Sequence, residues 1–102
     1  MRYNKLVRDK IPQIIQSTGG KAEIRILSDE EYVHYLKAKL NEEVAEFHKD
    51  QTVEELADIL EVVYALADAI GCNQRELMDV YQRKHDARGG FSEKILLIES
   101  EE

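Results

Sequence analysis

Residues 28–70 contain two long amphipathic segments in succession, SDEEYVHYLKAKLNEEVAEFHKD (28–50) and QTVEELADILEVVYALADAI (51–70). In the first, apolar side chains recur every three or four residues, which is typical of a helix that packs through one face. They are Tyr32, Val33, Leu36, Leu40, Val44 and Phe47. The second segment is apolar on nearly all sides and needs cover on two faces. Because only a few residues connect the segments, the sequence predicts two adjacent antiparallel helices.

Capping signals give the expected bounds of the helices. Three positions carry Ser, Thr or Asn followed three residues later by Glu, the pattern of a capping box: Ser28, Thr52 and Asn73. The helices predicted from these starts span roughly 29–49, 53–70 and 74–88. A shorter first helix is expected from Ile11 to Thr18, with Pro12 tolerated in its first turn.

Two short segments have strand-like patterns. Residues Ala22 to Leu27 alternate in polarity, and residues Lys94 to Ile98 are apolar and β-branched, so the two segments can pair with each other. We therefore predict an all-α fold, an antiparallel bundle of about four helices with a minor two-stranded β addition. A single domain over residues 1–102 is expected from this length.

The composition excludes several classes of protein. With 14 Lys+Arg against 21 Asp+Glu, the net charge of −7 disfavours a nucleic-acid binder, whose affinity comes from basic side chains. A hydrophobic fraction of 43% excludes a disordered chain. We expect a cytoplasmic protein without a membrane partner, because no apolar run is long enough for a signal or a membrane span. A single cysteine, Cys72, excludes an internal disulfide framework.

Four carboxylates lie on faces where an apolar side chain is expected. Glu43 falls within the apolar stripe of the first long helix and Glu46 lies at its edge, while Glu55 and Asp58 project from an apolar arc of the next helix. A carboxylate in such a position is costly unless it is paired, protonated or bound to a metal ion. An alternative for Glu55 is a capping role with Thr52.

The short connection places both pairs of acids near the same end of the helical hairpin. Repulsion among four converging carboxylates is relieved by a divalent cation. Oxygen ligands without Cys or an obligatory His select a hard ion. We therefore predict Mg²⁺ as the cofactor, with Mn²⁺ as a possible substitute.

Three runs of the sequence resemble one enzyme superfamily. Glu42-Glu43-Val44-Ala45-Glu46 followed by Glu55-Leu56-Ala57-Asp58 has the form EExxE then ExxD, and it resembles the signature of the MazG-like all-α nucleoside triphosphate pyrophosphohydrolases. The runs YNKLVRDKIP (3–12) and KHDARGGF (84–91) resemble the ends of a small single-domain branch that is phosphoribosyl-ATP pyrophosphohydrolase-like. Together the three runs touch both ends and the centre of the chain.

The resemblance implies an enzyme that hydrolyses a nucleoside triphosphate to the monophosphate and pyrophosphate, in nucleotide-pool house-cleaning. It implies Glu43, Glu46, Glu55 and Asp58 as metal ligands, with Glu46 as our choice for the carboxylate that activates water. Two alternatives remain open: phosphoribosyl-ATP pyrophosphohydrolase activity in histidine biosynthesis, and a non-catalytic helical oligomer that binds a nucleotide or a metal ion.

Basic side chains must balance the charge of a phosphorylated substrate. Lys84 and Arg88 follow Leu77 and Tyr81 on one face of the last helix, so this face can deliver them to phosphates. They can equally be charges that stabilise the C-terminus of that helix. Arg8 and Lys5 are further candidates for substrate binding.

We expect a homodimer or homotetramer, for two reasons. A helix that is apolar on two faces needs more cover than so short a chain provides. The family resemblance also implies dimers or tetramers.

Overall fold

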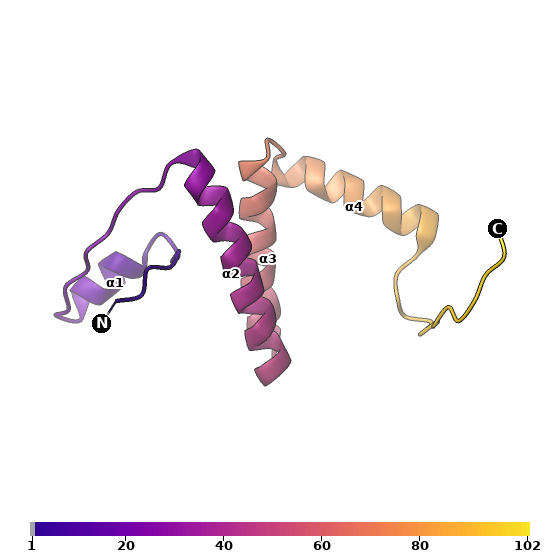
Figure 1. Ribbon diagram of the computed structural model, residues 1–102, viewed down its shortest axis with the longest axis horizontal. Coiled ribbons are helices and arrows are strands. Elements are labelled where there is room, and N and C mark those ends of the chain that lie inside the picture. Colours follow the sequence, from indigo (N-terminus) through magenta and orange to yellow (C-terminus); the bar gives the residue numbers. More distant parts are fainter. Residues whose placement is uncertain (1) are drawn as a thin grey trace.

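The computed structural model describes residues 2–102, and four helices follow one another along them (Figure 1). These are α1 (Ile11–Ser17), α2 (Asp29–Asp50), α3 (Val53–Ala69) and α4 (Gln74–Arg88). Each helix begins where the sequence predicted and ends within one residue of the predicted bound. The prediction of an all-α fold is therefore confirmed.

The two long helices begin at the predicted caps. The Ser28 hydroxyl accepts a hydrogen bond from the backbone N–H of Glu31 at 3.2 Å, and the Glu31 carboxylate accepts one from the Ser28 N–H at 3.0 Å. At the start of α3, Thr52 accepts a hydrogen bond from the backbone N–H of Glu55 at 3.3 Å. Between the helices, Gln51 adopts a left-handed conformation with φ of 51°, so the chain reverses within a few residues.

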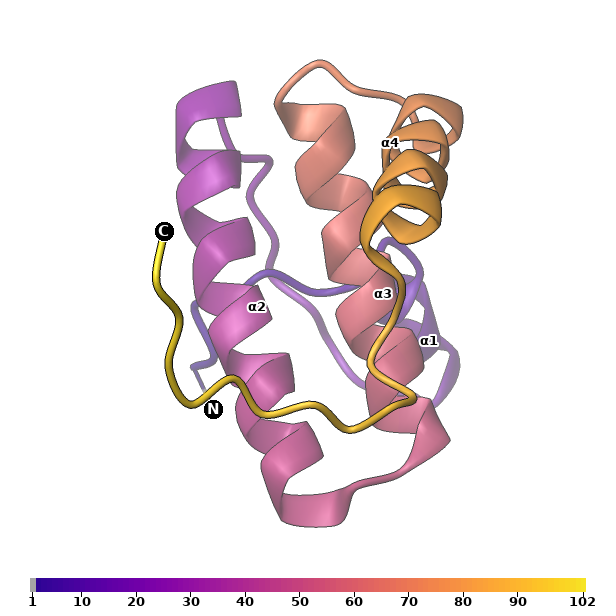
Figure 2. The same cartoon turned by 90° about the vertical axis from the view of Figure 1, so that its right-hand side faces the viewer.

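Helices α2 and α3 pack side by side as an antiparallel hairpin (Figures 1 and 2). The most buried side chain is Leu36 of α2, at 2% exposure, and the core continues with Val62 and Ala67 of α3. These residues lie on the faces that the periodicity predicted to be apolar. Burial of these side chains is the main stabilising contribution that holds the hairpin together.

The C-terminal arm, which we define as α4 with residues 89–102, projects from the hairpin (Figure 1). It begins where α3 ends and gives the molecule extents of 60 × 31 × 22 Å. Many of its large apolar side chains are exposed: Met78, Val80, Tyr81, Phe91, Ile95, Leu96, Leu97 and Ile98. The arm is therefore a helix and an extended segment with little cover from the rest of its own chain.

The predicted two-stranded addition is absent from residues 2–102. Residues 22–27 lie before α2, and residues 94–98 lie beyond α4 at the opposite side of the molecule (Figure 1). A strand needs a neighbour for its backbone N–H and C=O groups. Because α4 carries the second segment away from the first, neither segment has its expected partner within the chain.

Across residues 2–102, every helix is too short or too polar to cross a lipid bilayer.

Candidate metal centre

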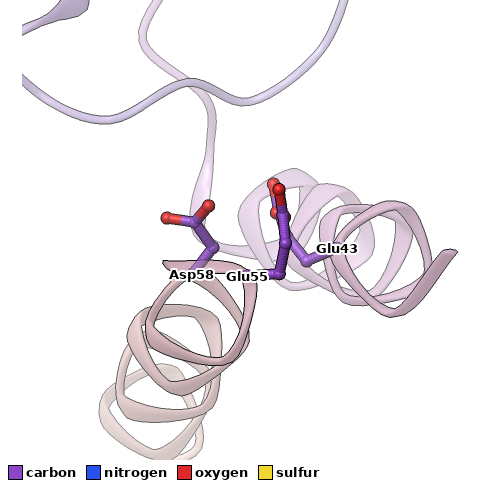
Figure 3. A group of neighbouring side chains, drawn as sticks. All are labelled: Glu43, Glu55 and Asp58. Carbon is purple, nitrogen blue, oxygen red and sulfur yellow. The ribbon is translucent and has the colours of Figure 1, made fainter. Parts of the chain in front are cut away.

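Three carboxylates converge at one end of the α2–α3 hairpin (Figure 3). Glu43 comes from α2, and Glu55 and Asp58 come from the beginning of α3. One carboxylate oxygen from each lies within 4.8 Å of the others. We call this end of the hairpin the acidic end. These residues are three of the four metal ligands that the sequence predicted, and they converge as expected.

Helix geometry and burial hold these side chains together. Glu43 is only 9% exposed, as its place in the apolar stripe predicted. Glu55 and Asp58 are three residues apart and therefore share one face of α3. The Thr52 cap engages the backbone N–H of Glu55, and the Glu55 carboxylate lies with the other two acids. Capping and cluster formation are thus compatible roles for Glu55.

A second group of acids adjoins the first through Glu55. Carboxylate oxygens of Glu46, Asp50 and Glu55 also lie within 4.8 Å of one another. Glu46, the fourth predicted ligand, therefore meets Glu55 on a more exposed side of the acidic end. Asp50 was missed by the sequence prediction. Its spacing from Glu43 and Glu46, which places all three on one face of α2, was the signal that could have identified it.

The concentration of negative charge disturbs ionisation at the acidic end. Desolvation raises the pKa of Glu55, and the carboxylates of Asp58, Glu46, Asp50 and Glu43 raise it further. Each of these neighbours makes a negative charge on Glu55 less favourable. A cation placed among the carboxylates reverses this effect, because it favours the ionised form of every one of them.

Two basic side chains already contact the cluster. The Arg8 Nη2 donates a hydrogen bond to Asp58 at 2.6 Å, and its Nη1 lies 3.6 Å from Glu61. The Lys39 Nζ lies 3.2 Å from Glu43. Lys39 was not predicted, although its position one helical turn before Glu43 is the usual spacing of an ion pair on a helix.

The N-terminal run lies along the same acidic surface. The Lys5 Nζ donates a hydrogen bond to Glu42 at 3.1 Å, and Lys39 lies 3.5 Å from the other oxygen of Glu42. Desolvation opposes the ionisation of Glu42, but these two lysines lower its pKa overall. The same ion pair raises the pKa of Lys5. The predicted substrate-binding residues Arg8 and Lys5 are therefore near the acids.

Lys84 and Arg88 are placed differently. They lie on α4, where they line a surface hollow of ≈ 770 Å³ together with Tyr81, His85 and residues 89–91. Helix α4 starts at the end of the hairpin opposite the acidic end and runs outward from it (Figure 1). Within one chain, the structure does not bring these two predicted residues to the carboxylates. The sequence could not reveal this, because helical periodicity gives the face of a helix and not its direction in space.

The residues at the acidic end suit a hard divalent ion. All the candidate ligands are carboxylate oxygens, the ligand type that Mg²⁺ and Mn²⁺ prefer. The buried Glu43 lies on one side of the cluster, and the exposed Glu46 and Asp50 lie on the side that is open to solvent. An Mg²⁺ ion typically takes one or two protein carboxylates and completes its shell with water and substrate phosphates. The donor set is therefore compatible with Mg²⁺.

Comparison with known proteins gives one relative. Over 48 residues, the chain is 52% identical to an uncharacterised protein of Mycolicibacterium smegmatis (strain ATCC 700084 / mc(2)155). The match covers 47% of this chain and 49% of that relative, so the chain aligns with about half of the relative's length. No protein-family model matches the chain. No solved structure matches it either.

Proposed function

We propose that this protein is a magnesium-dependent nucleotide pyrophosphohydrolase, which hydrolyses a nucleoside triphosphate to the monophosphate and pyrophosphate. One observation carries the proposal: carboxylates from two neighbouring helices converge within 4.8 Å, and one of them, Glu43, is 9% exposed. A buried carboxylate beside other acids is costly unless positive charge compensates it. Lys39 and Arg8 bring two positive charges to a cluster of five acids, so an excess of negative charge remains for a metal ion to compensate. The resemblance of the acidic runs to the MazG-like superfamily supplies the reaction class.

Each carboxylate has a proposed role. Glu43, Glu55 and Asp58 hold the ion, and Glu46 joins them from the open side with Asp50. When bound, Mg²⁺ offsets the negative charge on the phosphate oxygens. Glu46 is exposed and next to Glu55, so we propose that it orients the attacking water and accepts its proton. Mn²⁺ is the proposed substitute ion.

The basic side chains divide into two groups in this proposal. Arg8 and Lys5 of the same chain pair with Asp58 and Glu42. Their proposed role is to bind substrate phosphates. Lys84 and Arg88 lie on the C-terminal arm, so they contribute only if a second copy of the chain presents them. The proposed functional unit is therefore a homodimer or homotetramer, and its proposed location is the cytoplasm.

The experiment is a pyrophosphate-release assay with and without Mg²⁺. Its panel comprises nucleoside triphosphates with standard, deaminated and methylated bases, together with phosphoribosyl-ATP. We expect Mg²⁺-dependent release of pyrophosphate from at least one triphosphate, and its abolition in Glu43→Gln. Glu54→Gln, an exposed charge on the same hairpin, is the matched control and should retain activity.

Two outcomes of this assay contradict the proposal. Turnover of phosphoribosyl-ATP alone would assign the protein to the histidine pathway. Absence of turnover with every substrate, in a protein that binds Mg²⁺ or nucleotide, would indicate a non-catalytic binding module.

A further inference from the structure

The chain exposes much more surface than a folded monomer of its size. Its accessible surface is 9442 Å² at a mass of 11.8 kDa. Folded monomers of this mass expose about 5900 Å², so the excess is about 3500 Å². Permanent subunit interfaces bury roughly 2000–5000 Å² in total. Because that total is shared by two partners, each chain loses about 1000–2500 Å², so the excess is at least as large as the surface that association with another chain removes.

Much of the exposed apolar surface belongs to two extended segments. In residues 22–27, Ile24 and Ile26 are exposed, the latter at 85%. In residues 94–98, every apolar side chain is exposed, and Ile98 reaches 89%. Residues 95–98 therefore present a continuous apolar run to solvent, which is unusual for a chain that remains a monomer.

Within the described part of the chain, the backbones of these segments also lack strand partners, and Lys94 bonds only to the nearby Phe91 carbonyl. Among residues 2–102, no hydrogen bond between backbone groups involves residues 22–27 or residues 95–98. Exposed, apolar, extended backbone of this kind pairs readily with another strand. The Arg25 side chain lies 3.1 Å from Glu31 and so ties the first segment to the beginning of α2, which leaves Ile24 and Ile26 to project from the other face of an extended chain.

We infer that residues 94–98 of one copy add as a β-strand to residues 22–27 of a second copy. The two segments have the complementary strand-like patterns already noted, and they lie at opposite sides of a molecule 60 Å long. A reciprocal exchange in a two-fold dimer pairs both segments of both chains and leaves none unpartnered. It also covers apolar surface that the single chain leaves exposed. This inference rests on the association of copies within the proposed function, and on no part of the proposed hydrolysis.

Disulfide trapping between two differently labelled chains tests the exchange. Both chains carry Cys72→Ala; one has Ile24→Cys, and the other has a cysteine in place of Ile95, Leu96 or Leu97. After mixing and mild oxidation, we expect a covalent dimer containing one chain of each kind for at least one of the three positions. Gln82→Cys, on the exposed surface of α4, is the matched control and should give no such product. Failure of all three positions, or equal trapping through position 82, would overturn the inference.

Hydrogen exchange gives an independent test that needs no cross-link. In the unmodified protein, the amides of residues 22–27 should be protected, and Leu96→Pro in the distant C-terminal segment should speed their exchange. Ser100→Pro is the control and should leave that exchange unchanged, while circular dichroism verifies that the helices persist in each variant. Unprotected amides in residues 22–27 of the unmodified protein would contradict the inference. So would a double variant, Ile24→Cys with Leu96→Cys, that cross-links within a single chain.

These tests separate the inference from the proposed enzymatic activity. Neither of them needs substrate or Mg²⁺, so an inactive protein can still show the exchanged strands. Conversely, if the protein releases pyrophosphate but the two labelled chains give no disulfide-linked dimer, the proposed hydrolysis stands and the proposed strand exchange is wrong.

Discussion

The acidic end of the hairpin and the C-terminal arm both contain regular helices, but they differ in how far other parts of the molecule cover their side chains. At the acidic end, Glu43 is buried, two carboxylates of the other helix lie beside it, and Arg8 of the N-terminal run bonds to one of them, Asp58. Along the arm, helix α4 has a proper cap at Asn73, but its side chains are mostly exposed. Local signals therefore suffice to start and end a helix, and only tertiary contacts decide whether its faces are covered.

The comparison predicts different responses to mutation, and the largest effect is expected in the hairpin core. Leu36→Ala should lower the free energy of unfolding by about 2–5 kcal/mol, because the side chain is almost fully buried. Leu96→Ala on the arm should lower stability only at protein concentrations that favour association. Chemical denaturation at several protein concentrations measures both effects. A concentration-independent loss in Leu96→Ala would show that the arm packs against its own chain.

The next largest effect is expected on pyrophosphate release, if the acidic end of one copy works together with the C-terminal arm of another. Glu43→Gln and Lys84→Ala should each reduce pyrophosphate release, the first through the carboxylate cluster and the second without loss of Mg²⁺ binding. If a second copy presents Lys84, mixing the two variants after subunit exchange should restore part of the activity, because some sites then combine both intact residues. An unchanged rate of pyrophosphate release in Lys84→Ala would indicate that this lysine only stabilises the C-terminus of its helix.

A smaller effect is expected from the ion pair that links the N-terminal run to the acidic end. Arg8→Ala should change the free energy of unfolding by no more than about 1 kcal/mol, because both partners are substantially exposed. We expect it to raise KM for the triphosphate by up to about tenfold, equivalent to ~1.4 kcal/mol. Arg2→Ala, which removes an exposed basic side chain just before this run, is the control. Equal KM values for the two variants in steady-state kinetics would show that Arg8 does not bind the substrate.

The smallest effect concerns the attachment of residues 22–27 to α2. Hydrogen bonds from Arg25 and from the Ser28 backbone hold the pKa of Glu31 at about 2, below its unfolded value of 4.5. The resulting stability is present above pH 4.5 and is lost as the pH falls toward 2. Glu31→Gln should therefore be less stable than the unmodified protein at pH 7, and this difference should shrink by pH 2.5. Thermal melts at both pH values, with Glu30→Gln as the control, measure the difference.

The sequence predicted the helices and most of the acidic end because both depend on short-range spacing. Capping residues fix helix starts locally, and periodicity identified Glu43 as a carboxylate on an apolar face. Antiparallel packing followed from the short connection, so Glu55 and Asp58 had to meet Glu43. Asp50 and Lys39 obey the same periodicity and were predictable in principle.

The remaining features depend on long-range geometry that no local pattern contains. The direction of α4 determines where Lys84 and Arg88 lie, and it also separates residues 22–27 from residues 94–98. The sequence of residues 22–27 and 94–98 indicated strands, but such a pattern does not say whether the partner strand belongs to the same chain. The prediction of a two-stranded addition was therefore wrong for a single chain.

Calorimetric titration of Mg²⁺ into the nucleotide-free protein at pH 7 tests the central claim most directly. Because desolvation and then the neighbouring acids raise the pKa of Glu55, its charge is the one that a bound cation should stabilise most clearly. We predict that Glu55→Gln weakens Mg²⁺ binding by at least about tenfold, while Glu54→Gln, its exposed neighbour, binds as the unmodified protein does. Equal Mg²⁺ affinity in all three proteins, or no Mg²⁺ binding by any of them, would contradict the claim that the acidic end is a metal centre.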